Sequence, residues 1–155
     1  FCKTFKKVIL FEPYNQNIEC LKKNLEQYNN FKIEECALSN YSGNGQLFVD
    51  DNGLGNNTLY TTSELKNKVK VNVMKLDDYD LNEIDYIKID VQYHELEVIE
   101  GGINTLKKNR PLLCIEAARR TTEEREYVKK FKRILKDLDY KIVGAIGKEI
   151  FFKKI

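Results

Sequence analysis

Short apolar runs alternate with amphipathic segments along the chain, a pattern typical of a protein built from both strands and helices. The runs Val8 to Phe11 and Tyr86 to Val91 are continuous enough to predict strands that are buried on both faces. After each run, apolar residues recur at i, i+3, i+7 and i+10, which predicts a helix. These helical positions are Ile18, Leu21, Leu25 and Tyr28 after the first strand, and Leu96, Ile99, Ile103 and Leu106 after the second.

The remaining strands follow from shorter patterns. Val69, Val71 and Val73 alternate with polar residues, which predicts a half-exposed strand at the edge of a sheet. The other predicted strands are Phe31 to Cys36, Gln46 to Val49, Pro111 to Glu116, and a C-terminal antiparallel pair, Tyr140 to Ala145 with Glu149 to Lys153.

Strands that alternate with helices of this length require right-handed crossovers, so the sequence predicts an α/β fold. We expect a single domain over residues 1–155, with a mostly parallel sheet covered on both faces and an antiparallel pair at its C-terminal edge. The expected helix caps are Asn15 or Asn17 for the first helix, and Thr121 or Thr122 for a last helix that carries Val128, Phe131, Leu135 and Leu138.

Composition excludes several classes of protein without indicating an activity. The chain has 26 Lys and Arg against 24 Asp and Glu, and the two signs are interspersed, so no dedicated nucleic-acid surface is expected. No apolar run approaches the ~20 residues of a membrane span. The four cysteines form no metal-binding spacing and no secretion signal opens the chain, which favours buried, reduced thiols in a cytoplasmic protein.

Polar residues follow several predicted strands at the points where the strands end. In parallel α/β sheets, ligands bind at the carboxyl ends of the strands. The positions to consider are therefore Glu12, Ala37 to Asn40, Asp90 to Glu95, and Glu116.

Glu12 has two interpretations of about equal weight. A carboxylate at a strand end holds the two ribose hydroxyls of a nucleoside cofactor when a glycine-rich loop lies roughly 20 residues earlier. That distance falls upstream of Phe1, so we expect the glycine loop, and the strand that leads into it, before the first residue given. Alternatively, Glu12 is a strand-end acid whose partners are nearby backbone amides.

Polar groups are concentrated after Asp90, where Gln92, His94 and Glu95 stand at the entrance of the predicted helix. Capping and the helix dipole favour such residues whether or not a ligand is bound, and spacing alone favours this interpretation. His94 is the only histidine, so it can act as a lone base but cannot build a histidine metal cluster. More often such a histidine is simply solvated.

A set of segments in a fixed order indicates which of these interpretations of the strand-end residues to prefer. The longest runs Lys88-Ile89-Asp90-Val91-Gln92-Tyr93-His94-Glu95 and continues to Glu100-Gly101-Gly102. The others are Phe11-Glu12-Pro13, Ala37-Leu38-Ser39, Val73 to Asp78, Arg110-Pro111 and Ile115-Glu116. Each segment is a weak signal alone, whereas the ordered set, from about Val8 to Glu116, resembles the FkbM family of S-adenosylmethionine-dependent methyltransferases.

The resemblance implies an N-terminally truncated, Rossmann-like class I methyltransferase fold with S-adenosyl-L-methionine as cofactor. It implies that Glu12, with Pro13 beside it, holds the cofactor ribose, that Ala37 and Leu38 lie along the adenine, and that Asp90 faces the methyl donor or acceptor. Family members methylate hydroxyl oxygens, so the implied acceptor is a sugar or small-molecule hydroxyl. Such a transfer needs a base only for the hydroxyl proton. The candidate catalytic residues are Asp90, His94 and Glu95.

Two departures from the family pattern leave a second hypothesis open. Where the family has Glu-Gly, this chain has Gln92-Tyr93, which replaces a carboxylate by an amide and a glycine by a bulky ring. The second departure is that the glycine loop, and the strand that leads into it, are expected before the first residue given. The alternative is a catalytically inactive methyltransferase fold that acts as a binding or interaction module. A nicotinamide-dependent enzyme is less favoured, because the residues after Asp90 follow the methyltransferase pattern; the oligomeric state stays open.

Overall fold

The protein is described by a computed structural model that covers residues 1–49, 57–59, 67–117 and 121–155. The helices are α1 (Asn15–Leu25), α2 (Glu95–Glu100), α3 (Ile103–Asn109) and α4 (Thr122–Asp137), with a 3₁₀ turn η1 (Leu76–Tyr79). The strands are β1 (Val8–Phe11), β2 (Phe31–Glu34), β3 (Ala37–Leu38), β4 (Gly43–Val49), β5 (Asn67–Met74), β6 (Tyr86–Ile89), β7 (Leu112–Glu116), β8 (Tyr140–Ile146) and β9 (Glu149–Lys154).

The strands of the described residues form three sheets, with the orders β1-β2, β3-β5-β4 and β6-β7-β9-β8. Pairing is parallel in β1·β2, β3·β5 and β6·β7, and antiparallel in β4·β5, β7·β9 and β8·β9. The fold is therefore mixed α/β, as its class was predicted, but the sheets are mixed and the expected mostly parallel sheet is not observed. The predicted C-terminal hairpin is confirmed as β8 and β9.

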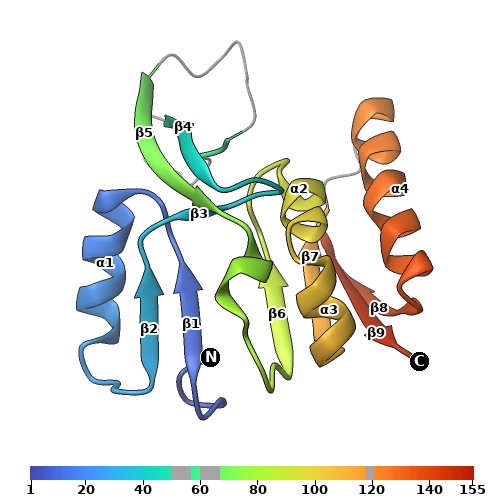
Figure 1. Ribbon diagram of the computed structural model, residues 1–155, viewed down its shortest axis with the longest axis horizontal. Helices are drawn as coiled ribbons and strands as arrows, with labels where there is room; N and C mark the ends of the chain where they lie inside the picture. The colour runs from blue at the N-terminus through green and yellow to red at the C-terminus, as the bar shows by residue number, and fades with distance from the viewer. Residues whose placement is uncertain (50–56, 60–66, 118–120) are drawn as a thin grey trace.

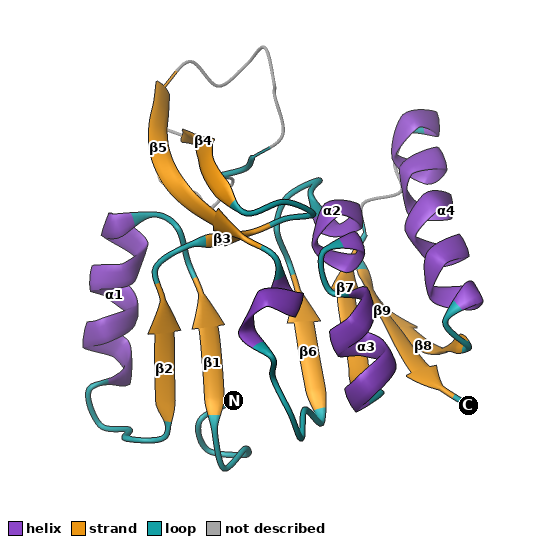
Figure 2. Cartoon of the chain, in the orientation of Figure 1, coloured by secondary structure: helices purple, strands orange, loops and turns teal. Residues whose placement is uncertain are grey.

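The strands that carry the candidate site residues run side by side. Figure 1 shows β1, β2 and β6 with their arrowheads at the same end, where β3 crosses and the β4–β5 pair rises above. Figure 2 shows α1 beside β2, the short helices α2 and α3 in front of β7, and α4 flanking β8 and β9. The carboxyl ends of β1 and β6, and hence Glu12 and Asp90, lie on one side of the molecule.

The strands predicted to be buried on both faces are less covered than expected. All four residues of β1 are half-buried, and in β6 only Ile89 is buried while Lys88 is exposed. Each strand has one hydrogen-bonded neighbour among the described residues, β2 for β1 and β7 for β6. A long apolar run therefore marks a strand, but the number of its neighbours decides its burial.

The strand predicted at an edge is central instead. β5 lies between β3 and β4, with Val73 opposite both Ala37 and Gly43. The alternation that suggested an edge arises because one face of β5 packs on a small core while the other faces solvent: Val71 and Val73 are buried, and Lys70 and Asn72 are exposed. Alternating burial therefore shows that one face of a strand is open to solvent. It does not show that the strand lies at the edge of its sheet.

The long helix predicted from Leu96 to Leu106 is two short helices, α2 and α3, separated at Gly101-Gly102. A Cβ atom on Gly101 would lie 1.9 Å from the backbone carbonyl oxygen of Ser39, so the chain must approach closely here. Asp77, from the resemblance segment before β6, accepts hydrogen bonds from the N–H groups of Asn104 (3.1 Å) and Thr105 (2.7 Å) in the first turn of α3. A carboxylate distant in sequence thus caps this helix.

Of the predicted caps, the one on α4 is confirmed. Thr121 is its N-cap, and its hydroxyl and the Glu124 carboxylate form a capping box. The expectation for α1 is wrong, because Tyr14 precedes this helix and makes no side-chain cap. Glu12 accepts the Tyr14 N–H instead, at 2.9 Å.

The main hydrophobic core belongs to the C-terminal half of the chain. Phe131, Leu135, Leu113, Ile115 and Ile150 are each at most 1% exposed, and they join α4 to β7 and β9. Burial of the thiols is only partly as predicted, since Cys36 and Cys114 are buried, Cys2 is half-buried and Cys20 is exposed. None of the described helices is both long and apolar enough to cross a membrane.

Candidate active site

The Glu12 carboxylate stands at the end of β1, where the chain turns into α1. It is half-buried, and its Oε1 accepts the N–H of Tyr14. Burial raises the pKa of Glu12, while hydrogen bonds from the Tyr14 backbone and the Asn17 side chain oppose that rise. Both interpretations of this residue are compatible with the geometry: the carboxylate has a local backbone partner, and it is an acceptor fixed at the carboxyl end of a strand.

The neighbouring segments are ordered by backbone pairing. Pro13 is half-buried and follows Glu12 directly. Ala37 is 7% exposed and Leu38 is half-buried, and both pair with β5 through Val73 and Met74. A groove of about 410 Å³ lies next to this segment in the chain; Cys36 and Met74 line it, whereas Ala37 and Leu38 do not.

Asp90 directly follows β6, and Glu116 is the last residue of the adjacent parallel strand β7. Their preceding residues, Ile89 and Ile115, are paired in register, so the two carboxyl groups are neighbours on the sheet. The hydrogen bond to Asp90, first, and then burial raise the pKa of Glu116, while Lys148 opposes the rise.

Two lysines flank this carboxyl pair. Lys148 Nζ is 3.2 Å from Glu116 Oε1, and Lys88 Nζ is 3.4 Å from Asp90 Oδ2. Lys88 also contacts Glu149 at 2.9 Å, and the hydrogen bond to Glu149 is the main cause that raises the pKa of Lys88 to about 12. Gln92 Nε2 donates to Asp90 Oδ1 at 3.3 Å. The carboxyl ends of β6 and β7 thus carry a pair of acids that share hydrogen bonds, between two cations.

The loop from β6 to α2 wraps around the carboxyl group of Glu95. Glu95 is 5% exposed and accepts hydrogen bonds from backbone N–H groups, among them that of Tyr93 at 3.3 Å. Burial raises the pKa of Glu95 to about 7, against the effect of these hydrogen bonds. Gln92 and Tyr93 adopt left-handed backbone conformations, with φ of 51° and 68°. Tyr93 thus stands in a conformation that glycine adopts without strain, where the family pattern has glycine.

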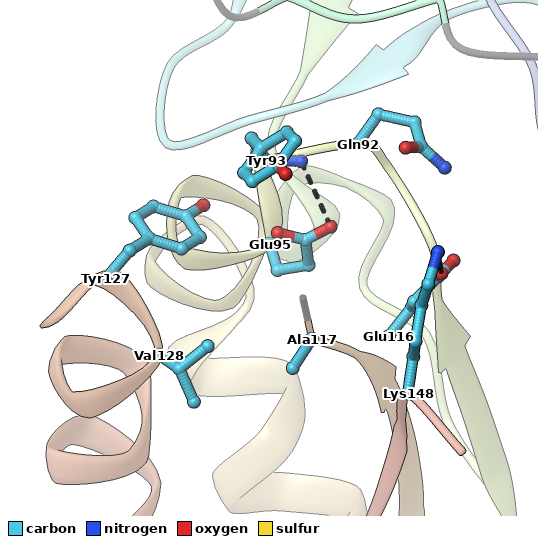
Figure 3. Close-up of a pocket in the computed structure, with 8 residues that line it drawn as sticks. All are labelled: Gln92, Tyr93, Glu95, Glu116, Ala117, Tyr127, Val128 and Lys148. Atoms are coloured by element: carbon cyan, nitrogen blue, oxygen red, sulfur yellow. Dashed lines mark hydrogen bonds and ion pairs between the residues drawn. The ribbon is translucent and has the colours of Figure 1, made fainter. Parts of the chain in front are cut away.

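A cleft of about 60 Å³ opens beside this loop, at the ends of β6 and β7 and against α4 (Figure 3). Glu95 and Tyr93 line it from the loop, Glu116 and Lys148 from the sheet, and Tyr127 from α4. Gln92, Ala117 and Val128 complete the lining. The cleft is large enough for a small polar group and presents a carboxyl, an ammonium and an amide to it.

His94 is buried rather than solvated, with a side chain 13% exposed. Its Nε2 is 2.9 Å from the Ser39 hydroxyl, and its Nδ1 is 3.6 Å from Glu97 Oε2. Burial lowers the pKa of His94, and Glu97 opposes this. The order serine, histidine, carboxylate resembles a nucleophilic triad, but Ser39 is 0% exposed, so no substrate reaches its hydroxyl.

The predicted site residues thus divide into separate groups. Of Glu12, Pro13, Ala37, Leu38, Asp90, His94 and Glu95, only Glu95 lines the cleft, and Asp90 reaches it through Gln92 and Glu116. Glu116 and Ser39 were considered only as residues at strand ends, and Lys148 and Tyr127 were missed. Lys148 precedes β9 and pairs with the end of β7, which no local pattern indicates. Ser39 offered one weak signal, its place in the ordered segments.

The acids at the strand ends do not form a metal site. Across the described residues, no group of three or more His, Cys, Asp and Glu side chains is arranged to hold a metal ion.

Comparison with known proteins identifies related domains. The family model of the methyltransferase FkbM domain matches residues 1–142. The chain is also similar to the crystal structure of a methyltransferase FkbM from Methylobacillus flagellatus KT, with 18% sequence identity and a TM-score of 0.66. This similarity covers 96% of the chain and 36% of the other protein, so the chain spans about a third of that protein's length. No curated protein matches the chain. At 18% identity, the structural similarity bears on the fold alone.

Proposed function

We propose that this chain, which belongs to the methyltransferase FkbM domain family, contributes an S-adenosylmethionine site and an acceptor site to an O-methyltransferase. The observation that carries the proposal is the arrangement of Glu12 and Asp90 at the carboxyl ends of β1 and β6, on one side of the molecule (Figure 1). This is the side on which α/β folds bind nucleotide ligands.

The residues around Glu12 fit the donor groups of the cofactor. A half-buried carboxylate at a strand end is a strong acceptor for the two hydroxyls of a ribose, and Pro13 fixes the backbone beside it. Ala37 and Leu38, held by β5, offer an apolar surface for the adenine. Bound there, S-adenosylmethionine supplies an electrophilic methyl group on its sulfonium.

Asp90 is the residue that we assign to the hydroxyl proton of the acceptor. It is adjacent to Glu116 and hydrogen-bonded to Gln92, and both of these line the cleft. The two other candidates are less suited, because both ring nitrogens of His94 face protein groups and Glu95 is wrapped by its own loop. A proton that Asp90 takes up can be shared with Glu116 through the hydrogen bond of this carboxyl pair, which stabilises the protonated pair.

The acceptor we propose is a hydroxyl on a sugar or another small polar scaffold. The cleft combines the Glu116 carboxylate, the Lys148 ammonium and the Gln92 amide, which can accept from and donate to neighbouring hydroxyl groups. An extended apolar ligand would remove water from these charged and polar groups without replacing its hydrogen bonds.

The test is calorimetric titration of S-adenosylhomocysteine into the wild-type chain and into Glu12→Gln. The amide keeps an acceptor for the Tyr14 N–H but loses the charge, so we expect affinity to fall roughly tenfold or more, the loss typical of a charge-assisted hydrogen bond. Glu19→Gln is the matched control, because Glu19 is an exposed acid on α1, and its affinity should equal that of the wild type.

Two further outcomes decide between the alternatives. Absence of binding by the wild-type chain contradicts the cofactor site and favours a non-catalytic binding module. If binding occurs, transfer of a labelled methyl group to a panel of sugars and small alcohols, and not to matched amines, would support O-methylation.

A further inference from the structure

We propose that Ser39, His94, Glu97 and Tyr127 form a buried positioning relay that fixes the cofactor-side segment after β3 against the loop and helix that follow β6. In this proposal His94 is a positioning residue and does not remove the proton of the acceptor. The inference rests on the proposed function, since it assigns Ala37–Leu38 to the cofactor and Asp90 to the acceptor of the same reaction.

The relay is a continuous chain of polar contacts across three elements. Ser39 Oγ and His94 Nε2 are 2.9 Å apart, and His94 Nδ1 lies 3.6 Å from Glu97 Oε2. The Tyr127 hydroxyl donates to the same Glu97 oxygen at 3.1 Å and accepts the N–H of Leu96 at 2.9 Å. The segment after β3, helix α2 and helix α4 are therefore joined through side chains.

The relay runs from a fully buried end at Ser39 to a partly exposed end at Glu97, so the Ser39–His94 hydrogen bond is the one that water replaces least easily. Ser39 is 0% exposed, the His94 side chain 13% and the Glu97 side chain 28%. Burial also raises the pKa of Tyr127 well above its ordinary value, so this hydroxyl remains a donor. The titratable groups that face His94 are Glu97, on its own helix, and Tyr127, on α4, which acts through Glu97.

The contacts select one tautomer of the neutral imidazole. A carboxylate only accepts, so the nitrogen that faces Glu97, Nδ1, carries the hydrogen. Nε2 is then the acceptor in this proposal, and the Ser39 hydroxyl, which lies 2.9 Å from Nε2 and 3.5 Å from Asn40 Oδ1, donates to the nearer atom. A histidine without polar partners on its two ring nitrogens would not be held in this tautomer.

The backbone around the relay leaves little room for movement. The Ser39 carbonyl lies against Gly101 at the end of α2, where a Cβ atom would overlap it, and Asn40 Nδ2 donates to Glu100 Oε2 at 2.8 Å. The residue pair Ala37–Leu38 immediately precedes Ser39, and Asp90 is four residues before His94. These contacts keep the two segments together when the Ser39–His94 bond is lost, so in this proposal its loss changes the fine position of the two halves of the site and not the fold.

The experiment uses the one histidine of the 155 residues as its own probe. Imidazole ¹⁵N chemical shifts of His94 are recorded against pH in the wild-type chain and in Ser39→Ala, together with S-adenosylhomocysteine binding by calorimetry. We expect a neutral Nδ1–H imidazole in the wild type. Ser39→Ala removes the donor to Nε2, so His94 should gain Nε2–H tautomer and a higher pKa, and binding should weaken roughly threefold to tenfold, the range of one hydrogen bond.

Ser42→Ala is the matched control, because Ser42 lies three residues further along the same connection and bonds to Asp78 instead of α2. It should leave both the imidazole shifts and the affinity unchanged. If folding of Ser39→Ala fails, Glu97→Gln replaces it; the loss of the carboxylate should lower the pKa of His94 further.

The outcomes separate the relay from the function on which it rests. A wild-type His94 in the Nε2–H form, or one that Ser39→Ala leaves unchanged, overturns the relay even if the cofactor analogue binds. A changed imidazole with unchanged affinity overturns the positioning role. Absence of binding by the wild type contradicts the proposed function, while the imidazole shifts still test the hydrogen bonds.

Discussion

At the scale of single residues, the loop from β6 to α2 holds a carboxyl group that is costly to ionise. Glu95 is 5% exposed, and burial raises its pKa from 4.5 to about 7. The backbone N–H groups that surround it belong to a loop in which Gln92 and Tyr93 are left-handed. Left-handed conformations cost free energy for residues other than glycine, and here the hydrogen bonds to Glu95 offset part of that cost.

Glu95 should make the stability of the protein depend on pH. Its folded-state pKa lies above its unfolded value, so the stabilisation from its neutral form is complete below about pH 4.5 and disappears as the pH rises through 7. At 1.36 kcal/mol per unit of pKa shift, the full contribution is about 3 kcal/mol, most of it lost between pH 5 and pH 8. Urea unfolding of Glu95→Gln and wild type at pH 5 and pH 8 should show the wild type losing about that much relative to the variant.

Glu19→Gln provides the reference for this titration, since Glu19 is exposed on α1. Its unfolding free energy should follow that of the wild type at both pH values. Parallel curves for Glu95→Gln and wild type would show instead that Glu95 ionises as an exposed acid does.

At the scale of elements, the break between α2 and α3 is a packing requirement. Apolar residues continue at helical spacing from Leu96 to Leu106, and Gly101 itself has an ordinary φ of −73°. Gly101 is needed because the backbone of Ser39 occupies the space that a side chain would fill. The close approach holds the segment after β3 against α2, and Asp77 then caps the first turn of α3.

Gly101→Ala should destabilise the protein strongly, by about 3 kcal/mol or more, because the added methyl group overlaps backbone atoms that cannot rotate away. Gly144→Ala is the control: Gly144 lies in β8 with no atom within 4 Å of a Cβ, so its effect should be within about 1 kcal/mol of zero. Thermal and urea unfolding measure both. Equal stability of the two variants would mean that Ser39 and Gly101 are not in contact.

At the scale of the whole molecule, stability is distributed unevenly. The larger core joins α2, α3, α4 and the sheet β6-β7-β9-β8, and its members Leu113, Ile115, Phe131 and Leu135 have no exposed surface. The smaller core lies between β3, β4 and β5. In the unit formed by β1, α1 and β2, Ile18 is the buried side chain, and β1 is half-buried along its length. The proposed ribose residue, Glu12, therefore belongs to a part of the described chain that is less buried than the larger core.

Amide hydrogen exchange should resolve this difference. The N–H groups of β7, which has β6 on one side and β9 on the other, should exchange more slowly than those of β1 by a factor of about 10 or more. S-adenosylhomocysteine should slow exchange in β1 most, because binding at Glu12 stabilises the weaker unit. Equal protection of β1 and β7 without ligand would contradict this distribution of stability.

The sequence alone determined the local features of this protein. Apolar periodicity and capping chemistry depend on residues that are close in the chain, so they predicted the strands β1 and β6, the C-terminal hairpin, helix α4 with its Thr121 cap, and the mixed α/β class. The ordered segments around Asp90 indicated the FkbM family for the same reason, since a motif is a local pattern.

The tertiary structure decided the features that depend on contacts between distant segments, namely strand position, burial and side-chain partners. Val71 and Val73 alternate identically in an edge strand and a central strand, so only pairing with β3 and β4 placed β5. His94 appeared free to act as a base until Ser39, 55 residues earlier, and Glu97 enclosed its ring. The burial of a residue is set by neighbours that are distant in the sequence. Burial in turn decides which groups stay neutral and which are free to react. A local sequence pattern predicts neither these neighbours nor the burial.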